Sequence, residues 1–475
     1  MTAARTALAT VGRTPPGPRG TPILGNLRAL RRDPCGLFLR AAVEHGGLAR
    51  IRVAHLSAYL VSEPAFIKRV LVDNMRNYVK GVSYQALRHL LGEGLLVAEG
   101  ETWRRQRRIV NPAFARQALV DHVPAMRDVT AALCDRWEAG AAAGEPFDLV
   151  AEMMGLAFQV VGVTLMGAEI ADEMAEVAAA LPAAGEWVYR HMQAPIRIPP
   201  SIPTPANVRF RRVVRALDRV VHRVIAKHRD EAEGGARDML SMLVAAEDET
   251  GARLGDVELR DQVITFLLAG HETTGSALAW VLALLADHPL VEARVIAELD
   301  AVTGGRPVTA QHLPALVYLG QVIDEAMRLY PPAWSFTRTA VAEDFLGPYR
   351  IPRGAMVVVS PWVNHRNPAW WRDPEMFDPD RFAPDRAKAL ETYHYFPFGG
   401  GPHLCIGKYL TLTELKVAVA TIAQRFRVTR AERSPIGVEA AVTLRPAGAV
   451  PVRAHRRAAR QAVSRREALA QKEAS

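Results

Sequence analysis

One cysteine lies in a glycine-rich loop that runs directly into a predicted helix. The loop reads Phe398-Gly-Gly-Gly401-Pro-His-Leu-Cys405-Ile-Gly407, and apolar residues follow it at helical spacing. A sulfur in this place faces the free N–H groups of a helix N-terminus, which lower the pKa of a thiol and favour its thiolate. Glycine lets the backbone approach a bulky flat partner, and Phe398 can cover the sulfur. A thiolate ligand of haem iron needs these features, whereas the alternative is a structural cysteine buried beside a glycine turn.

The other cysteines and the charge distribution exclude several classes of protein. Cys35, Cys134 and Cys405 are far apart, so neither a disulfide framework nor a zinc motif is expected. The 475 residues are 49% hydrophobic and 23% charged, as in globular proteins. The net charge of +9 comes mainly from the chain ends: residues 453–475 hold seven basic and two acidic residues, and the first twenty hold three arginines. The basic pI therefore indicates charged tails and does not indicate a nucleic-acid groove.

Helical periodicity dominates the chain, so the predicted fold is mainly α with a small β region. Strands are expected at 48–53 and 58–62 as a hairpin, at 337–360 and at 427–453, and the prolines at 195–205 predict an irregular loop. We expect a leader at 1–13, one domain at 14–452 and a basic tail at 453–475. The tail has few large aliphatic residues, so we expect it to be dispensable for cofactor binding. No secretory signal or membrane span is expected, which favours a cytoplasmic protein.

The longest predicted helix, Asp256–Asp287, carries polar residues at its centre. It contains Ala269-Gly-His-Glu272-Thr273 between apolar runs and ends at His288-Pro289. A buried acid is costly, and a threonine hydroxyl can bond to a carbonyl one turn back and loosen the helix. The segment is therefore either a functional site or a solvated polar patch.

Two further pairs of residues have the spacing of neighbours on a helix face. Glu325 and Arg328 are three residues apart, directly before a Leu-Tyr-Pro-Pro stop. Trp103 and Arg107 are four apart, and both carry N–H donors suited to carboxylates. Each pair alone has an ordinary explanation, as an exposed ion pair or as a basic helix surface.

Taken together, these segments resemble the cytochrome P450 family over about residues 15–452, with His403 where many members carry arginine. The resemblance implies a single haem domain with haem b, ligated by Cys405 through its thiolate. Phe398, Gly401 and Gly407 would shape the haem loop. It also implies haem propionate contacts, which would be Trp103, Arg107, Arg338 and His403. It implies a buried charge network of Glu325, Arg328 and Arg381, where Arg381 comes from a P-x-x-F-x-P-x-R-F segment.

The resemblance further implies a monooxygenase of the soluble bacterial type. Thr273 would hold the bound dioxygen and its water, Glu272 would help to deliver protons, and Ala269, Trp334 and Phe336 would line the substrate pocket. The substrate would be lipophilic, such as a fatty acid or a terpenoid, and would be hydroxylated or epoxidised. Electrons would come from a separate ferredoxin or flavodoxin with its reductase. The alternatives are a haem-thiolate peroxygenase or isomerase, and a non-catalytic haem protein that binds ligands.

Overall fold

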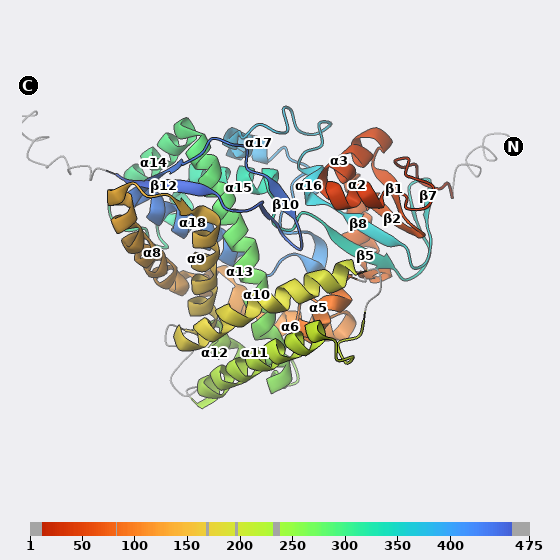
Figure 1. The fold of residues 1–475 in the computed structure, drawn as a ribbon, viewed down its shortest axis with the longest axis horizontal. Coiled ribbons are helices and arrows are strands. Elements are labelled where there is room, and N and C mark those ends of the chain that lie inside the picture. The colour runs from red at the N-terminus through yellow and green to blue at the C-terminus, as the bar shows by residue number, and fades with distance from the viewer. Residues whose placement is uncertain (1–11, 82, 168–170, 195–197, 231–237, 458–475) are drawn as a thin grey trace, which may run out of the picture.

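The computed structural model describes residues 12–81, 83–167, 171–194, 198–230 and 238–457. Long helices fill most of the molecule, and the strands of the largest sheet lie at the end where the N-terminal segment is found (Figure 1). The α-helices are α2 (Leu27–Arg32), α3 (Pro34–His45), α4 (Pro64–Lys68), α5 (Ser83–Leu91), α6 (Gly100–Val110), α7 (Arg116–Leu119), α8 (Val123–Ala143), α9 (Leu149–Met166), α10 (Ala171–Gln193), α11 (Pro205–Asp230), α12 (Met239–Ala245), α13 (Asp256–Asp287), α14 (Pro289–Thr303), α15 (Val317–Leu329), α16 (Pro361–Asn364), α17 (Pro384–Ala387) and α18 (Lys408–Arg425). The mainly helical fold predicted from the sequence is confirmed.

Helix α13 is the central element, and it has the bounds that were predicted. The Glu258 carboxylate accepts a bond from the Gly255 N–H at 3.1 Å and so caps the start of the helix. Pro289 begins the next helix directly after the end of α13. Helix α9 packs along α13, and an added Cβ at Gly270 would lie 2.8 Å from the Val161 side chain. Glycine at this position therefore permits the close approach of the two helices.

The largest sheet has the strand order β1-β2-β8-β5-β3. The strands of the structure are β1 (Leu48–Val53), β2 (Leu56–Val61), β3 (Tyr78–Lys80), β4 (Phe147–Asp148), β5 (Phe336–Ala340), β6 (Asp344–Leu346), β7 (Tyr349–Ile351), β8 (Met356–Val359), β9 (Phe426–Arg430), β10 (Val438–Ala440), β11 (Leu444–Pro446) and β12 (Pro451–Arg456). The predicted hairpin is β1–β2, paired from Leu48 opposite Val61. Strand β3 pairs with β5 and places Lys80 opposite Arg338, which brings two distant basic residues together.

The C-terminal strand β12 runs past the predicted domain boundary. It pairs with β9 from Val452 to Arg456, so the expected end at Val452 falls inside a strand. Ala454 is buried there, while Arg456 and Arg457 reach Glu138 and Asp300. The prediction counted large aliphatic residues only. Hydrogen bonds to the neighbouring strands and the ion pairs of Arg456 and Arg457 hold this strand although it has few such residues. At the other end, Arg13 already bridges to Tyr349, and residues 1–11 and 458–475 of the predicted leader and tail lie outside the described residues.

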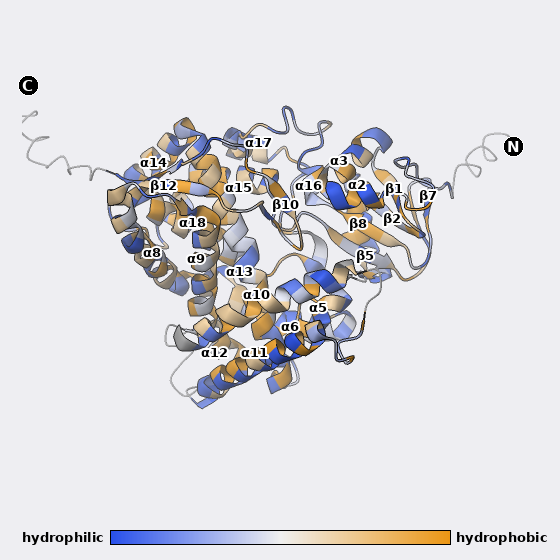
Figure 2. Ribbon diagram, viewed as in Figure 1, coloured by the Kyte–Doolittle hydropathy of each residue, from blue (hydrophilic) through white to orange (hydrophobic). Residues whose placement is uncertain are grey.

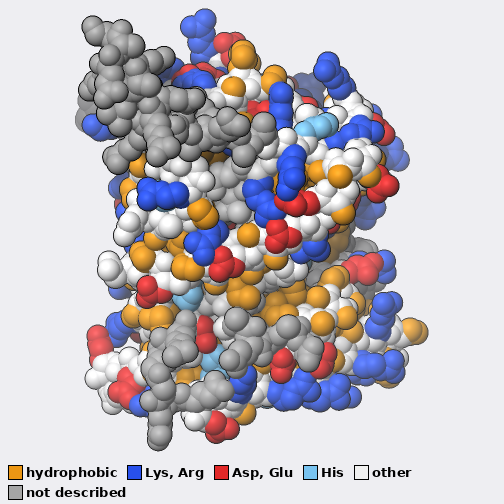
Figure 3. All heavy atoms as spheres, turned by 90° about the vertical axis from the view of Figure 1, so that its left-hand side faces the viewer, with side chains coloured by type: hydrophobic (Ala, Val, Ile, Leu, Met, Phe, Trp, Pro, Cys, Tyr) orange, Lys and Arg blue, Asp and Glu red, His pale blue; other side chains and the backbone are white. Residues whose placement is uncertain are grey.

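The surface and interior differ in the way expected of a globular protein. Helix α11 alternates polar and apolar residues along its length, and the β1, β2 and β8 strands are mainly apolar (Figure 2). Acidic and basic side chains are interspersed over the face in Figure 3, with a row of basic ones along its lower edge. By length and composition, Leu149–Met166 could cross a membrane, and a bent pair of helices, Asp256–Asp287 with Pro289–Thr303, passes the same test together. The first is 61% buried and packs on α13, as a core helix does.

Candidate active site

The loop before α18 holds Cys405 in the geometry that the sequence predicted. The Cys405 N–H donates to the Phe398 carbonyl at 3.0 Å, and the N–H groups of Gly407 and Lys408 point at the sulfur. The residue is exposed, so a ligand can reach it. The pKa of the thiol is nevertheless raised, because the surrounding protein desolvates it more than these N–H groups and Arg107 stabilise the thiolate. The N–H groups of Gly407 and Lys408 thus lower the pKa of the thiol as the sequence indicated, but desolvation outweighs them.

Glycine is required at one position of this loop. Gly401 has φ of +67°, and an added Cβ would collide with the backbone carbonyl of Leu71. Gly399 also has positive φ, at +72°, but no other atom would lie within 4 Å of a Cβ added there. A cavity of about 200 Å³ adjoins the loop, lined in part by Arg107, Phe114 and Cys405.

A cluster of basic residues surrounds His403. The His403 ring lies against Trp103, with 4.0 Å between ring centroids. Burial, together with the nearby charges of Lys80, Arg338 and Arg107, lowers the pKa of His403 to about 3. Burial also lowers the pKa of Lys80 to about 7, with Glu99 opposing this shift. Several cations thus share one partly buried place, which fits the two propionate carboxylates of haem.

Lys80 was not predicted from the sequence as part of this cluster. It joins the cluster because β3 pairs with β5, and that pairing could not be read from the chain. Its ammonium group donates to the carbonyls of Leu95 at 3.1 Å and Ala98 at 2.6 Å. The Lys80 N–H bonds the Glu99 carboxylate at 2.6 Å, so the segment around Lys80 is firmly anchored.

The polar centre of α13 presents its two predicted functional residues in different directions. The Thr273 hydroxyl donates to the Ala269 carbonyl at 2.6 Å, and the exposed Ala269 shows that this face is open. The Glu272 carboxylate instead accepts a bond from the Thr443 hydroxyl at 2.6 Å. Arg445 lies 3.8 Å from the same carboxylate oxygen. Thr443 and Arg445 were not predicted as partners of Glu272, because they come from a hairpin far along the chain.

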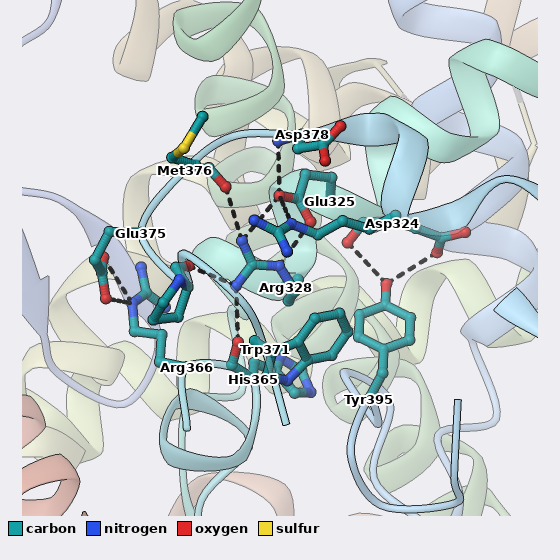
Figure 4. Close-up of polar contacts among 12 residues, drawn as sticks. Asp324, Glu325, Arg328, His365, Arg366, Trp371, Glu375, Met376, Asp378 and Tyr395 are labelled. Carbon is teal, nitrogen blue, oxygen red and sulfur yellow. Dashed lines mark hydrogen bonds and ion pairs between the residues drawn. The ribbon is translucent and has the colours of Figure 1, made fainter. Parts of the chain in front are cut away.

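The predicted charge network is present, and its Glu325–Arg328 pair is fully buried (Figure 4). The Arg328 guanidinium donates to both oxygens of Glu325, at 2.6 and 2.8 Å, and both side chains are 0% exposed. Arg328 also donates to three backbone carbonyls, and Arg381 lies 3.3 Å from Glu325. Burial raises the pKa of Glu325, with Arg328 opposing the shift. The network joins α15 to the segment that precedes the haem loop, so its role is in the fold.

A second buried polar pair adjoins this network and was not predicted. The Tyr395 hydroxyl donates to the Asp324 carboxylate at 2.9 Å (Figure 4). Burial raises the pKa of Asp324 to about 6, while the Tyr395 bond opposes the shift.

The two aromatic residues predicted to line the pocket have other contacts. Trp334 is 8% exposed, lies 5.8 Å from the Phe38 ring between centroids, and donates to the Ala441 carbonyl at 3.1 Å. It therefore anchors the C-terminal hairpin to the N-terminal core. Phe336 is half-buried against the sheet, with the Arg338 guanidinium 5.2 Å from its ring centroid.

The chain belongs to the cytochrome P450 family, whose model matches residues 15–448. It is 41% identical over 414 residues to the cyclooctat-9-en-7-ol 5-monooxygenase of Streptomyces melanosporofaciens, covering 86% of this chain and 88% of that one. It is 36% identical over 413 residues to the pentalenene oxygenase of Streptomyces avermitilis, covering 87% and 90% of the two chains. The crystal structure of the cytochrome P450DA heme domain superposes with a TM-score of 0.86 at 28% identity, covering 94% of this chain and 99% of that one.

The protein is therefore a haem b monooxygenase of lipophilic small molecules. The residues of this site fit haem. The Cys405 thiol faces two backbone N–H groups, and the cations around His403 lie near it. Members of the family use dioxygen and receive electrons from a redox partner.

Proposed function

We propose that this enzyme hydroxylates or epoxidises a cyclic terpenoid. The proposal rests on two relatives, 41% and 36% identical, whose names specify the oxidation of cyclooctat-9-en-7-ol and of pentalenene. A terpenoid is favoured over a fatty acid on that basis. Electrons would come from a separate ferredoxin or flavodoxin with its reductase, in the cytoplasm.

The residues of this chain would divide the work around the bound haem. Haem supplies the activation of dioxygen and the oxidation step. Cys405 would bind its iron through the thiolate, which the N–H groups of Gly407 and Lys408 would stabilise. The propionates would be held by a basic and aromatic set, namely Lys80, Trp103, Arg107, Arg338 and His403.

Two residues of α13 would handle protons on the substrate side. The Thr273 hydroxyl, now bonded to the Ala269 carbonyl, would hold dioxygen and a water on the open face of the helix. Glu272 would supply protons from the neighbouring position. This acid–alcohol pair also separates the proposal from its rivals, since an enzyme that uses peroxide does not need protons delivered to dioxygen.

The first test combines a ligand variant with a substrate panel. The reduced carbonyl complex should show the red-shifted Soret band of thiolate ligation, and Cys405→Ser should abolish it. Cyclic terpene hydrocarbons and alcohols should shift the spectrum of the purified enzyme and should give oxygenated products with a donor system, whereas fatty acids should not. Turnover of fatty acids alone would disprove the terpenoid assignment, and binding without NADPH consumption would favour a ligand-binding protein.

The second test addresses the proton pathway. Thr273→Ala should leave haem and substrate bound, because the hydroxyl contributes to the transition state more than to uniform binding. Reducing equivalents should then appear as peroxide or water instead of product. Unchanged coupling of NADPH to product would count against this role.

A further inference from the structure

The molecule has a second hollow, between α14 and α15, that is separate from the cavity beside Cys405. The two helices pack against each other on the side of the molecule away from the β1–β2 hairpin (Figure 1). The segment around the short helix Pro379–Phe382 completes the wall. The hollow has a volume of about 450 Å³ and shares no lining residue with the cavity beside Cys405. A space of this size is within the range of small-molecule sites.

The charged groups that line the α14–α15 hollow already have partners. The Arg294 guanidinium donates to both oxygens of Asp380, each at 2.9 Å, and lies 3.9 Å from the centroid of the Tyr318 ring. The Glu298 carboxylate accepts bonds from the N–H groups of Tyr318 at 2.7 Å and Leu319 at 2.9 Å, and so caps the start of α15. One basic and two acidic side chains leave the lining with one net negative charge. An anion would therefore be repelled, and a cation would have to compete with bonds that are already made.

Two polar groups of the lining have no partner in the part of the chain that the structure describes. Gln321 is 9% exposed, and no described residue bonds its side-chain amide. Tyr318 is also 9% exposed, and its hydroxyl is buried without a hydrogen bond. A buried polar group without a hydrogen bond is costly, and native proteins contain few of them. The hollow that both residues line is the place from which a missing partner can reach the Gln321 amide.

We propose that the α14–α15 hollow is a second binding site, which takes an uncharged organic molecule with a hydroxyl or carbonyl group on an apolar body. The Gln321 amide would bond the polar group, since an amide both donates and accepts. The apolar body would lie against Ala297, Val317 and Ala383. The Arg294–Asp380 pair and the capping Glu298 would stay as they are, because an uncharged ligand does not compete for their bonds.

The site is connected to the buried charge network. Gln321 precedes Glu325 by about one turn of α15. Asp380 is the neighbour of Arg381, which lies 3.3 Å from Glu325. A ligand that touches α15 and the segment around Asp380 would hold these two elements together. Its binding should therefore stabilise the folded enzyme and leave the haem iron unchanged.

Two variants remove the site in different ways. Gln321→Leu replaces the amide by an apolar side chain of similar size. It should not lower the melting temperature, because it deletes a polar group that has no hydrogen bond. Ala297→Trp fills the hollow from the exposed face of α14. Ala293→Trp is the matched control, since Ala293 is also exposed on α14 but does not line the hollow.

The first measurement is calorimetric titration of the haem-loaded enzyme with adamantanol, a rigid apolar cage that carries one hydroxyl group. The iron is first saturated with phenylimidazole, an azole that ligates haem, so that the space above it is filled. One equivalent of adamantanol should bind, and it should bind more tightly than adamantanecarboxylate or adamantylammonium. Gln321→Leu should weaken this binding by roughly tenfold. Ala297→Trp should abolish it, and Ala293→Trp should leave it unchanged.

The second measurement is the melting temperature of the same samples. Saturating adamantanol should raise it by about 1–2 °C in the original enzyme and in Ala293→Trp. Ala297→Trp should show no rise, and the carbonyl spectrum should be the same in every variant.

Three results would overturn the proposal. The first is no binding of adamantanol to the enzyme with blocked iron, which would mean that the hollow holds only water. The second is binding that Gln321→Leu and Ala297→Trp leave unchanged, which would place the ligand elsewhere. The third is tighter binding of the carboxylate or the ammonium analogue, which would exclude an uncharged ligand as the preferred class.

Discussion

At the scale of single residues, two glycines of one loop allow the cost of a positive φ to be compared with the cost of a steric clash. Gly399 and Gly401 have φ of +72° and +67°, which ordinary residues adopt at a cost. Only at Gly401 would a side chain also strike the backbone, at the Leu71 carbonyl. A substitution at Gly399 therefore tests the effect of φ alone, and one at Gly401 tests φ and the clash together.

Gly399→Ala should lower the free energy of unfolding by about 1 kcal/mol, which is the cost of the left-handed conformation. Gly401→Ala should cost more, because the loop must also move away from Leu71, and this movement displaces Cys405. Carbonyl difference spectra and denaturant unfolding of both variants test the comparison. Equal losses in the two variants would show that the loop has room to adjust.

The buried pair of Glu325 and Arg328 should tolerate no loss of one partner. Glu325→Ala or Arg328→Ala leaves an uncompensated buried charge, at a cost of about 3–5 kcal/mol. Little soluble haem-containing protein should be recovered. The exposed Arg190–Glu186 pair on α10 is the control, and Arg190→Ala should leave the melting temperature nearly unchanged. Normal yields of stable holoprotein from the Glu325 or Arg328 variants would contradict the energetic role of the network.

At the scale of elements, local patterns predicted helices well and long-range pairings poorly. The bounds of α13 followed from its apolar period and the Pro289 stop, and the Glu325–Arg328 pair followed from helical spacing. The basic cluster lacked Lys80 because that residue enters through the pairing of β3 with β5. The contact of Thr443 with Glu272 was missed because 171 positions separate the two residues. The contacts of Trp334 with Phe38 and Ala441 were not predicted either, because they join segments that are far apart in the chain.

Strand β12 sets a limit on how far the C-terminus can be shortened. A chain that ends at Arg457 keeps the pairing of β12 with β9 and the Arg456 and Arg457 ion pairs. It should bind haem and substrate as the full chain does. A chain that ends at Val452 loses four of the five paired positions and should melt at a lower temperature, contrary to the expectation from composition. Identical melting curves for the two truncations would show that these pairings add nothing.

At the scale of the whole molecule, one buried carboxyl should make stability depend on pH. Burial raises the pKa of Asp324 to about 6 in the folded protein, from 3.8 when exposed. The folded state then binds more protons than the unfolded state between these values, so stability falls as pH rises through about 6. The difference amounts to at most about 3 kcal/mol.

Asp324→Asn should remove this dependence and keep a hydrogen-bond partner for Tyr395. Unfolding curves of the original protein and the variant, measured between about pH 4 and 8, should converge at low pH, separate as pH rises to about 6, and stay apart above it, with the variant the more stable there. Parallel curves over the whole range would show that Asp324 is not the group that causes the pH dependence.

The position of β12 near the C-terminal end of the described residues affects when the haem site can form during synthesis. Lys80 and Trp103 emerge early, whereas Cys405, the Thr443 hairpin and β12 emerge last. Strand β12 must then insert between β4, which lies far upstream, and β9. Contacts of such long sequence separation make folding slow, because closing the intervening loop costs entropy. A growing chain therefore cannot hold haem between its basic cluster and Cys405 until the segment that carries Cys405 has been made.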